Sequence, residues 1–223
     1  MSEKHVNPIS VQLSAPVWNL MPFEGKSLLA IEQRDELKRQ VSFSVYNFAQ
    51  NQFLWRDVVL PEKWWINLTG FSGDLIVLKV FESTENPDKT SFLFLEAESG
   101  KVTNPPQQID WIHTINTFRP FQYHEGEPDF ATVKNFLSTR LPVTPKLGAE
   151  YLEYDHYVIL SYYVGDPAAF VNRLALFNLQ GECYFDEEIG TKLKGIGINT
   201  FFVTSGYLFF VKNKTELVTF RIV

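Results

Sequence analysis

The chain has 223 residues, with 20 Lys and Arg against 26 Asp and Glu, and therefore a formal net charge of -6. This acidic balance argues against a protein that binds nucleic acid through the phosphate backbone. Phe, Tyr and Trp make up 15% of the residues. Because aromatic residues favour strands over helices, the composition predicts an all-β fold, and the length is sufficient for a large core.

The N-terminal residues lack the basic start and the apolar segment of a secretory signal peptide. The most apolar windows, 75–81 and 201–211, are far shorter than the roughly 20 residues of a membrane-spanning helix. Cys183 is the single cysteine, so no intrachain disulfide can form. These features predict a soluble, cytoplasmic protein that does not enter a membrane.

A weak internal repeat runs along the chain. An apolar residue followed by asparagine recurs, with the asparagines at positions 19, 67, 116 and 199, which are 48, 49 and 83 residues apart. Six or seven residues after three of these asparagines comes a glycine, at Gly25, Gly73 and Gly206, and then an apolar run. This pattern is typical of a β-turn that leads into a buried strand.

A second apolar run follows in each repeat, at 41–45, 92–95, 174–179 and 217–220. Gly100 and Gly181 come after two of these runs, where a tight hairpin requires a positive φ angle. The repeats are therefore predicted to be β-hairpins in series. The charged run at 34–39 is predicted to be the tip of one hairpin.

An insertion accounts for the long third interval. Residues 119–147 contain four prolines and one predicted helix, with Asp129 as its N-cap and Phe130, Val133, Phe136 and Leu137 on one face. The helix is expected to end before Pro142. The third interval exceeds the earlier intervals of 48 and 49 residues by about 35 residues, and the insert supplies most of this excess.

The repeats predict a single all-β domain over residues 1–223. Its four units are 19–66, 67–115, 116–198 with the insert 119–147, and 199–223 completed by residues 6–18. A length of about 48 residues suits one propeller blade. We expect a small closed repeat like a four-bladed β-propeller, and the alternative is a β-sandwich or barrel.

The order of turn, inner strand, second strand and glycine-containing hairpin, as in Asn178-Leu179-Gln180-Gly181-Glu182, resembles the blades of WD-like and quinoprotein-like propeller families. The Gly-His and Trp-Asp signatures of true WD repeats are absent. The chain is also similar, in length and aromatic β-pattern, to an uncharacterised bacterial family. The first resemblance implies a repeated β fold, and the second implies no function.

Catalytic signatures such as Gly-x-Ser-x-Gly, a phosphate loop, a dinucleotide glycine fingerprint or His-Glu-x-x-His do not occur in the sequence. The candidates for acid–base chemistry or divalent metal binding are imidazoles and carboxylates in and before the insert: His113, His124, Glu125, Glu127 and Asp129. Their spacing does not establish that they converge, and the alternative is a solvated loop before the helix. We expect no cofactor and no bound metal.

Aromatic residues supply the candidate binding surface. A flat platform for a sugar ring or a partner's side chain is predicted from Trp64, Trp65, Trp111, Tyr162 and Tyr163. Neighbouring residues of a strand face opposite sides, so at most one of Trp64 and Trp65 can point into a core.

Strands without a recognisable catalytic set predict a non-catalytic binding or scaffolding protein, whose partner is a protein or a small ligand. The first alternative is a metal-assisted hydrolase or lyase that uses His113, His124 and the acidic residues of the insert. The second is a carbohydrate-binding module that uses surface Trp and Tyr residues. The sequence predicts no particular oligomeric state.

Overall fold

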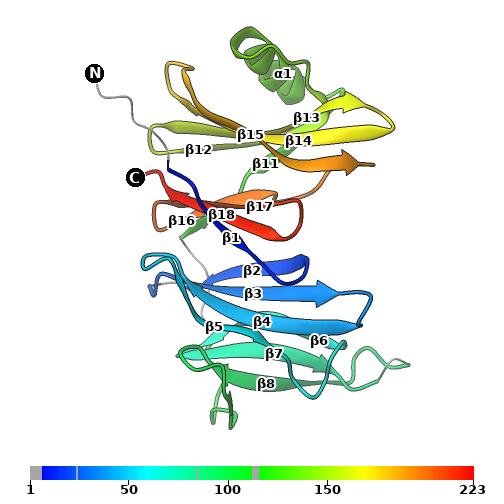
Figure 1. Cartoon of the computed structure of the whole chain (residues 1–223), viewed down its shortest axis with the longest axis vertical. Coiled ribbons are helices and arrows are strands. Elements are labelled where there is room, and N and C mark those ends of the chain that lie inside the picture. Colours follow the sequence, from blue (N-terminus) through cyan, green and yellow to red (C-terminus); the bar gives the residue numbers. More distant parts are fainter. Residues whose placement is uncertain (1–6, 24, 84, 112–115) are drawn as a thin grey trace. The chain divides into compact units, whose positions relative to one another are not determined.

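The computed structural model describes residues 7–223 except residues 24, 84 and 112–115. The described residues form 18 strands in four antiparallel sheets and one α-helix (Figure 1). The chain divides into two compact units. We call Leu13–Asn116 the continuous unit, and Met1–Gln12 together with Thr117–Val223 the split unit.

The continuous unit contains two four-stranded antiparallel sheets, each with its strands in chain order. The first consists of β2 (Val17–Phe23), β3 (Leu28–Asp35), β4 (Gln40–Asn47) and β5 (Gln52–Val58). The second consists of β6 (Ile66–Ser72), β7 (Leu75–Phe81), β8 (Thr90–Glu96) and β9 (Val102–Thr103).

Alternation along the strands builds the core of the continuous unit. Leu28 and Ala30 of β3 and Ile76 and Leu78 of β7 belong to one buried cluster, which draws residues from both sheets. Because residues two apart in a strand share a face, these pairs place one face of each sheet against the other sheet.

The split unit contains two five-stranded antiparallel sheets and the helix. One sheet has the order β1 (Ile9–Gln12), β18 (Glu216–Arg221), β17 (Tyr207–Lys212), β16 (Phe201–Thr204) and β10 (Thr117–Phe118). The other has the order β11 (Phe121–His124), β12 (Lys146–Tyr154), β13 (Tyr157–Asp166), β14 (Ala169–Asn178) and β15 (Cys183–Leu193).

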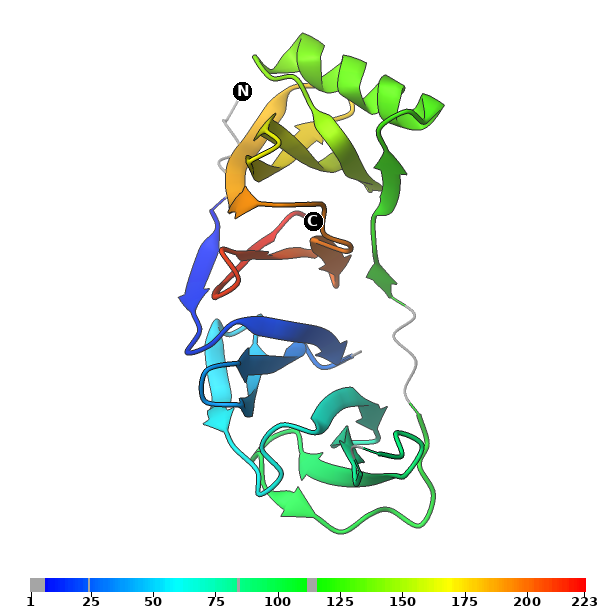
Figure 2. The ribbon, with the colours of Figure 1, turned by 90° about the vertical axis from the view of Figure 1, so that its right-hand side faces the viewer.

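Helix α1 (Pro128–Arg140) covers one face of the sheet β11–β15, as Figure 2 shows. Its buried residues Phe130, Val133 and Leu137 pack against a cluster that includes Leu160 and Phe177. The other face of the sheet carries residues such as Leu174 and Leu176, which pack against residues of β16, β17 and β18. Strands β13 and β14 are therefore buried on both faces.

The turns before the apolar strands follow the predicted pattern. Gly25, Gly73 and Gly206 have φ angles of 75°, 54° and 76°, and β3, β7 and β17 begin within three residues of them. At the N-terminus, β1 pairs with β18, with Ile9 opposite Thr219. Of the predicted closing segment 6–18, the structure describes residues 7–18, and among these only Ile9–Gln12 form a strand of that sheet, because Val17 already begins β2.

The insert differs from its predicted form in two ways. The N-cap is Glu127 rather than Asp129, because Pro128, which is pre-organised for the first helical turn and needs no N–H partner, begins the helix. The segment is also not purely helical, since β11 pairs with β12 as a strand of the five-stranded sheet. The helix ends at Arg140, before Pro142 as predicted.

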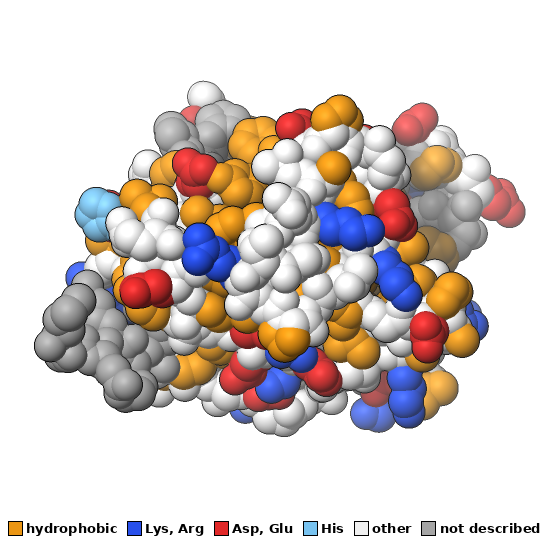
Figure 3. Space-filling model, turned by 90° about the horizontal axis from the view of Figure 1, so that it is seen from above, with side chains coloured by type: hydrophobic (Ala, Val, Ile, Leu, Met, Phe, Trp, Pro, Cys, Tyr) orange, Lys and Arg blue, Asp and Glu red, His pale blue; other side chains and the backbone are white. Residues whose placement is uncertain are grey.

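Charged side chains of both signs are interspersed on the face seen in Figure 3, without a concentration of basic groups. Within the described part of the chain, no helix has both the length and the apolar character that crossing a membrane requires.

Burial of α1 predicts the effect of a cavity beneath it. Leu137 of α1 is fully buried between the helix and the sheet, so Leu137→Ala should lower the free energy of unfolding by about 2–5 kcal/mol. Leu37→Ala removes the same atoms from a side chain that is 98% exposed and should change it by less than about 0.5 kcal/mol. Urea unfolding followed by circular dichroism measures both, and equal effects would show that α1 does not pack as described.

Candidate binding pocket

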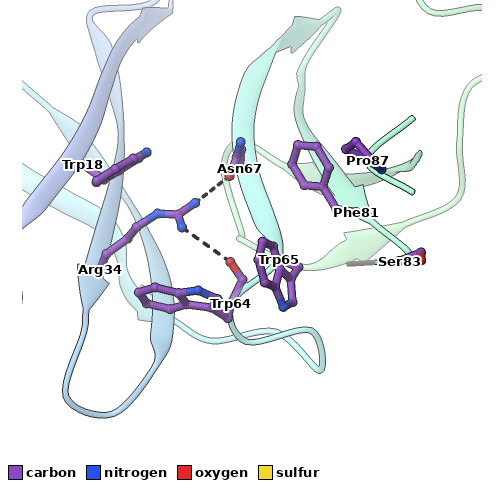
Figure 4. Close-up of a pocket in the computed structure, with 8 residues that line it drawn as sticks. All are labelled: Trp18, Arg34, Trp64, Trp65, Asn67, Phe81, Ser83 and Pro87. Atoms are coloured by element: carbon purple, nitrogen blue, oxygen red, sulfur yellow. Dashed lines mark hydrogen bonds between the residues drawn. The ribbon is translucent and has the colours of Figure 1, made fainter. Parts of the chain in front are cut away.

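A pocket of about 310 Å³ lies in the continuous unit (Figure 4). Half of its lining residues are aromatic, and the lining comes from both sheets of the unit and from the segments that flank their strands. The residues are Trp18, Arg34, Trp64, Trp65, Asn67, Phe81, Ser83 and Pro87. We call this feature the tryptophan pocket.

Irregular backbone orients the three tryptophans. The register of β2 and β3 shifts between Val17 and Asn19, so Trp18 lies at a β-bulge, a device that redirects a side chain. Trp64 and Trp65 lie between β5 and β6, where the Glu62 carboxylate accepts hydrogen bonds from both of their backbone N–H groups at 2.8 Å. These two hydrogen bonds lower the pKa of Glu62.

The two adjacent tryptophans have different environments. Trp64 is partly buried and packs against the core of the continuous unit, whereas Trp65 is 44% exposed. Its backbone is nonetheless fixed, because the Trp65 carbonyl oxygen accepts a hydrogen bond from the Phe81 N–H at 2.9 Å. Only Trp64 of the pair packs against the core, although the two residues precede β6 and strand alternation, on which the prediction was based, does not apply to them.

Arg34 is the polar centre of the pocket. Its Nε donates to Glu32 Oε1 at 2.8 Å, and its Nη2 donates to the Ile66 carbonyl oxygen at 2.9 Å and to Asn67 Oδ1 at 2.5 Å. Its Nη1 reaches the Trp64 carbonyl oxygen at 3.5 Å. The guanidinium of β3 thus connects the first sheet to the start of the second.

Two indole rings flank the same guanidinium. Arg34 Cζ lies 4.8 Å from the ring centroid of Trp18 and 5.4 Å from that of Trp64, and Figure 4 shows the side chain between the two rings. Cation–π attraction favours this arrangement. Arg34 therefore fixes the positions of two of the three tryptophans.

The counter-charge of Arg34 is the fully buried carboxylate of Glu32. Its second oxygen accepts a hydrogen bond from the Leu68 N–H at 2.8 Å. Loss of hydration raises the pKa of Glu32, and the bonds from Leu68 and Arg34 oppose this effect. Because both carboxylate oxygens are engaged inside the protein, Glu32 is not available to a ligand.

The lining contains aromatic rings, amide and hydroxyl groups and one ion-paired guanidinium. Among its described residues there is no histidine, cysteine or carboxylate that could exchange a proton with a substrate or hold a metal. The lining residues can stack on flat groups and form directed hydrogen bonds.

The acidic candidates of the insert instead stabilise local backbone. Glu127 accepts a hydrogen bond from the His124 N–H at 2.7 Å, and Glu125 accepts one from the Leu147 N–H at 3.0 Å. Asp129 lies in the first turn of α1. His124, Glu125, Glu127 and Asp129 are all exposed.

The structure describes four of the five candidates for acid–base or metal chemistry, namely His124, Glu125, Glu127 and Asp129. His113 lies outside the described residues, and no group of three potential metal ligands occurs in the part of the chain that the structure describes. The carboxylates of the insert have a visible structural role as acceptors for turn N–H groups.

The aromatic candidates separate into three places. Trp64 and Trp65 line the tryptophan pocket, whereas Trp111 lies over Gly70 and meets the ring of Phe92 edge-on, with 5.8 Å between ring centroids. Trp111 is 41% exposed but does not line the pocket.

Tyr162 and Tyr163 are not a surface platform, because they are 0% and 1% exposed on the doubly covered strand β13. The Tyr162 hydroxyl donates to Asp186 at 2.9 Å, and the Tyr163 hydroxyl accepts from the Gly197 N–H at 2.6 Å. Burial raises the pKa of both phenols. The sequence could not reveal this covering, since it depends on the packing of α1 and the second sheet.

Trp18, Arg34, Asn67 and Phe81 are pocket residues that the sequence analysis did not identify as a site. Arg34 belongs to the charged run that was predicted to be a hairpin tip. Its two-residue spacing from Glu32 was the available signal, because it places both side chains on one face of β3. Asn67 is one of the repeat asparagines.

The chain is similar to a known protein family over part of its length. A family model described as a domain of unknown function, DUF4905, matches residues 24–103, which is less than half of the chain. The matched range extends from β3 to β9 and contains every pocket residue except Trp18. No curated protein matches the chain.

Glu32→Gln tests the ion pair beneath the pocket. The substitution leaves the Arg34 charge without its buried partner and should lower the free energy of unfolding by about 3 kcal/mol. Asp35→Asn on the same hairpin removes a carboxylate whose partner Lys38 is largely exposed, and should change it little. Chemical unfolding of both variants checks this, and a Glu32→Gln protein as stable as the wild type would contradict the assigned role.

Proposed function

We propose that the protein is a non-catalytic binding module and that the tryptophan pocket holds its ligand. The observation that carries this proposal is the position of Arg34, ion-paired with buried Glu32 and flanked by Trp18 and Trp64. This arrangement uses a buried ion pair to hold aromatic rings at the surface, and pre-organised rings favour binding.

Exposure of the rings supports the same proposal. Trp18 is 63% exposed and Trp65 is 44% exposed, although their backbones are held by strand pairing and by Glu62. Tryptophan is enriched among residues that dominate binding energy, because a large rigid ring loses little conformational entropy on contact. Two such rings beside one pocket provide a binding surface without a catalytic group.

The metal-assisted hydrolase or lyase has less support. It requires His124 and the acidic residues of the insert to face a common point, and their described carboxylates instead accept backbone hydrogen bonds. A carbohydrate-binding module retains Trp64 and Trp65 but loses the two buried tyrosines from its predicted platform.

We also infer that the four sheets close into a small four-bladed repeat. The sheets β2–β5 and β6–β9 and the strands β11–β15 are each ordered along the chain, as in consecutive blades. The pairing of β1 with β18 supports closure, because a sheet built from both ends of the chain joins the last repeat to the first. Such closure would also protect an edge of the last sheet.

A mixed fragment library tests the binding function without assuming a ligand class. In ligand-observed NMR, fragments bound by the wild type should lose their saturation-transfer signal with Trp65→Ala and keep it with Trp111→Ala, whose ring is equally exposed but lies outside the pocket.

A library with no binder, or with binders that are insensitive to Trp65→Ala, would refute the pocket as the binding site. The same samples can be assayed with hydrolase and lyase substrates. Turnover that is lost in Glu127→Gln would overturn the non-catalytic function.

A further inference from the structure

We propose that the tryptophan pocket docks a proline-rich peptide segment in the polyproline II conformation. This inference rests on the proposed binding function and specifies the ligand. It follows from the hydrogen-bonding groups of the pocket, which supply donors and few free acceptors.

The donors are indole, amide and guanidinium N–H groups. No described residue accepts a hydrogen bond from the indole N–H of Trp18, Trp64 or Trp65, whereas the indole of Trp55 donates to the Ala97 carbonyl oxygen at 2.8 Å. The amide nitrogen of Asn67 likewise has no acceptor among the described residues.

Three acceptors of the pocket already accept hydrogen bonds from the protein. Asn67 Oδ1 accepts from Arg34, and the Trp64 carbonyl oxygen faces the Nη1 of the same side chain. Ser83 Oγ accepts from the backbone N–H groups of Glu85 and Asn86, at 3.2 and 3.3 Å. A complementary ligand therefore presents acceptors to the pocket without bringing donors that need partners.

Proline residues have this property, because they carry a backbone carbonyl group but no N–H. In a polyproline II helix these carbonyls make no internal hydrogen bonds and point outward. Sugar hydroxyls and ordinary peptide N–H groups would bring donors into a site whose acceptors are engaged, and an unsatisfied donor is costly to desolvate. The hydrogen-bond inventory thus favours a proline segment over a sugar chain.

The shape and charge of the site agree with this ligand. Trp18, Trp65 and Phe81 supply aromatic faces, and proline-rich segments dock between such faces with little loss of entropy because they are already extended. The Arg34 charge is matched by Glu32, so the pocket does not require an anionic ligand. A volume of about 310 Å³ suits a few residues rather than a long segment.

The test uses the full-length protein and decaproline with an acetylated N-terminus and an amidated C-terminus. Isothermal titration and tryptophan fluorescence should show saturable binding. A glycine–serine decamer of equal length, which is flexible and carries N–H groups, and the sugars cellohexaose and maltohexaose should not bind.

Variants of Trp65 show whether decaproline contacts the tryptophan pocket, and they separate the effect of the aromatic ring from that of the indole N–H donor. Trp65→Ala should weaken decaproline binding at least about tenfold, as for a binding hot spot, and Trp65→Phe should weaken it less because the ring remains. Trp111→Ala is the matched control and should keep the wild-type affinity. If Trp65→Ala unfolds, Trp18→Ala replaces it, since that side chain is 63% exposed.

Each other result overturns a defined part of the inference. Saturable binding of a sugar, lost with Trp65→Ala and without decaproline binding, would refute the peptide ligand while leaving the pocket as a binding site. Decaproline binding that is unchanged in Trp65→Ala would refute the location. Failure of decaproline, the sugars and the fragment library alike would refute both the inference and the proposed function.

Discussion

A buried glutamate connects the two sheets in each compact unit. In the continuous unit, Glu32 of β3 accepts the N–H of Leu68 in β6. In the split unit, Glu150 of β12 accepts the N–H groups of Asn199 and Thr200, just before β16. Both carboxylates are almost completely buried, and desolvation raises the pKa of each. A buried carboxylate without partners would be very unfavourable, so these hydrogen bonds are a condition for the packing of the sheets.

Both glutamates accept a hydrogen bond from the backbone N–H of the residue that follows a repeat asparagine, but the other partners of the two carboxylates differ. Leu68 and Thr200 each follow a repeat asparagine. At these two positions of the repeat, a buried glutamate of one sheet therefore forms a hydrogen bond with the other sheet of the same unit or the segment that leads into it. The Glu150 carboxylate also accepts a hydrogen bond from the Thr200 hydroxyl, which in turn is within hydrogen-bond distance of the Ser161 hydroxyl. This network lies inside the split unit. Glu32 is completed by Arg34, whose long side chain reaches the surface and attracts indole rings. The guanidinium partner of Glu32 is thus the group that contacts the indole rings of the tryptophan pocket, whereas the partners of Glu150 are a hydroxyl and backbone N–H groups.

Local patterns predicted the strands but not the pocket. Turn glycines and alternating apolar residues act within a few positions, so the strands that follow Gly25, Gly73 and Gly206 could be predicted from sequence. The prediction that at most one of Trp64 and Trp65 enters the core assumed a strand, whereas both residues precede β6 and Glu62 holds their backbone N–H groups. The bond from Arg34 to Asn67 joins residues 33 positions apart, and no local pattern specifies such a contact. Tyr162 was misjudged for the same reason, because only the packing of α1 shows that it is covered.

Both sheets of the continuous unit supply residues to the tryptophan pocket, so binding at this proposed site would be coupled to folding. Trp18 belongs to the first sheet of the continuous unit, whereas Trp65 is fixed to β7 of the second through its carbonyl oxygen. A ligand that contacts both rings can bind only while the two sheets are packed, so its binding energy adds to the free energy of unfolding of this unit. The buried ion pair has a double role in consequence. It holds the two sheets together at a cost in desolvation, and it orients two of the indole rings of the proposed binding site.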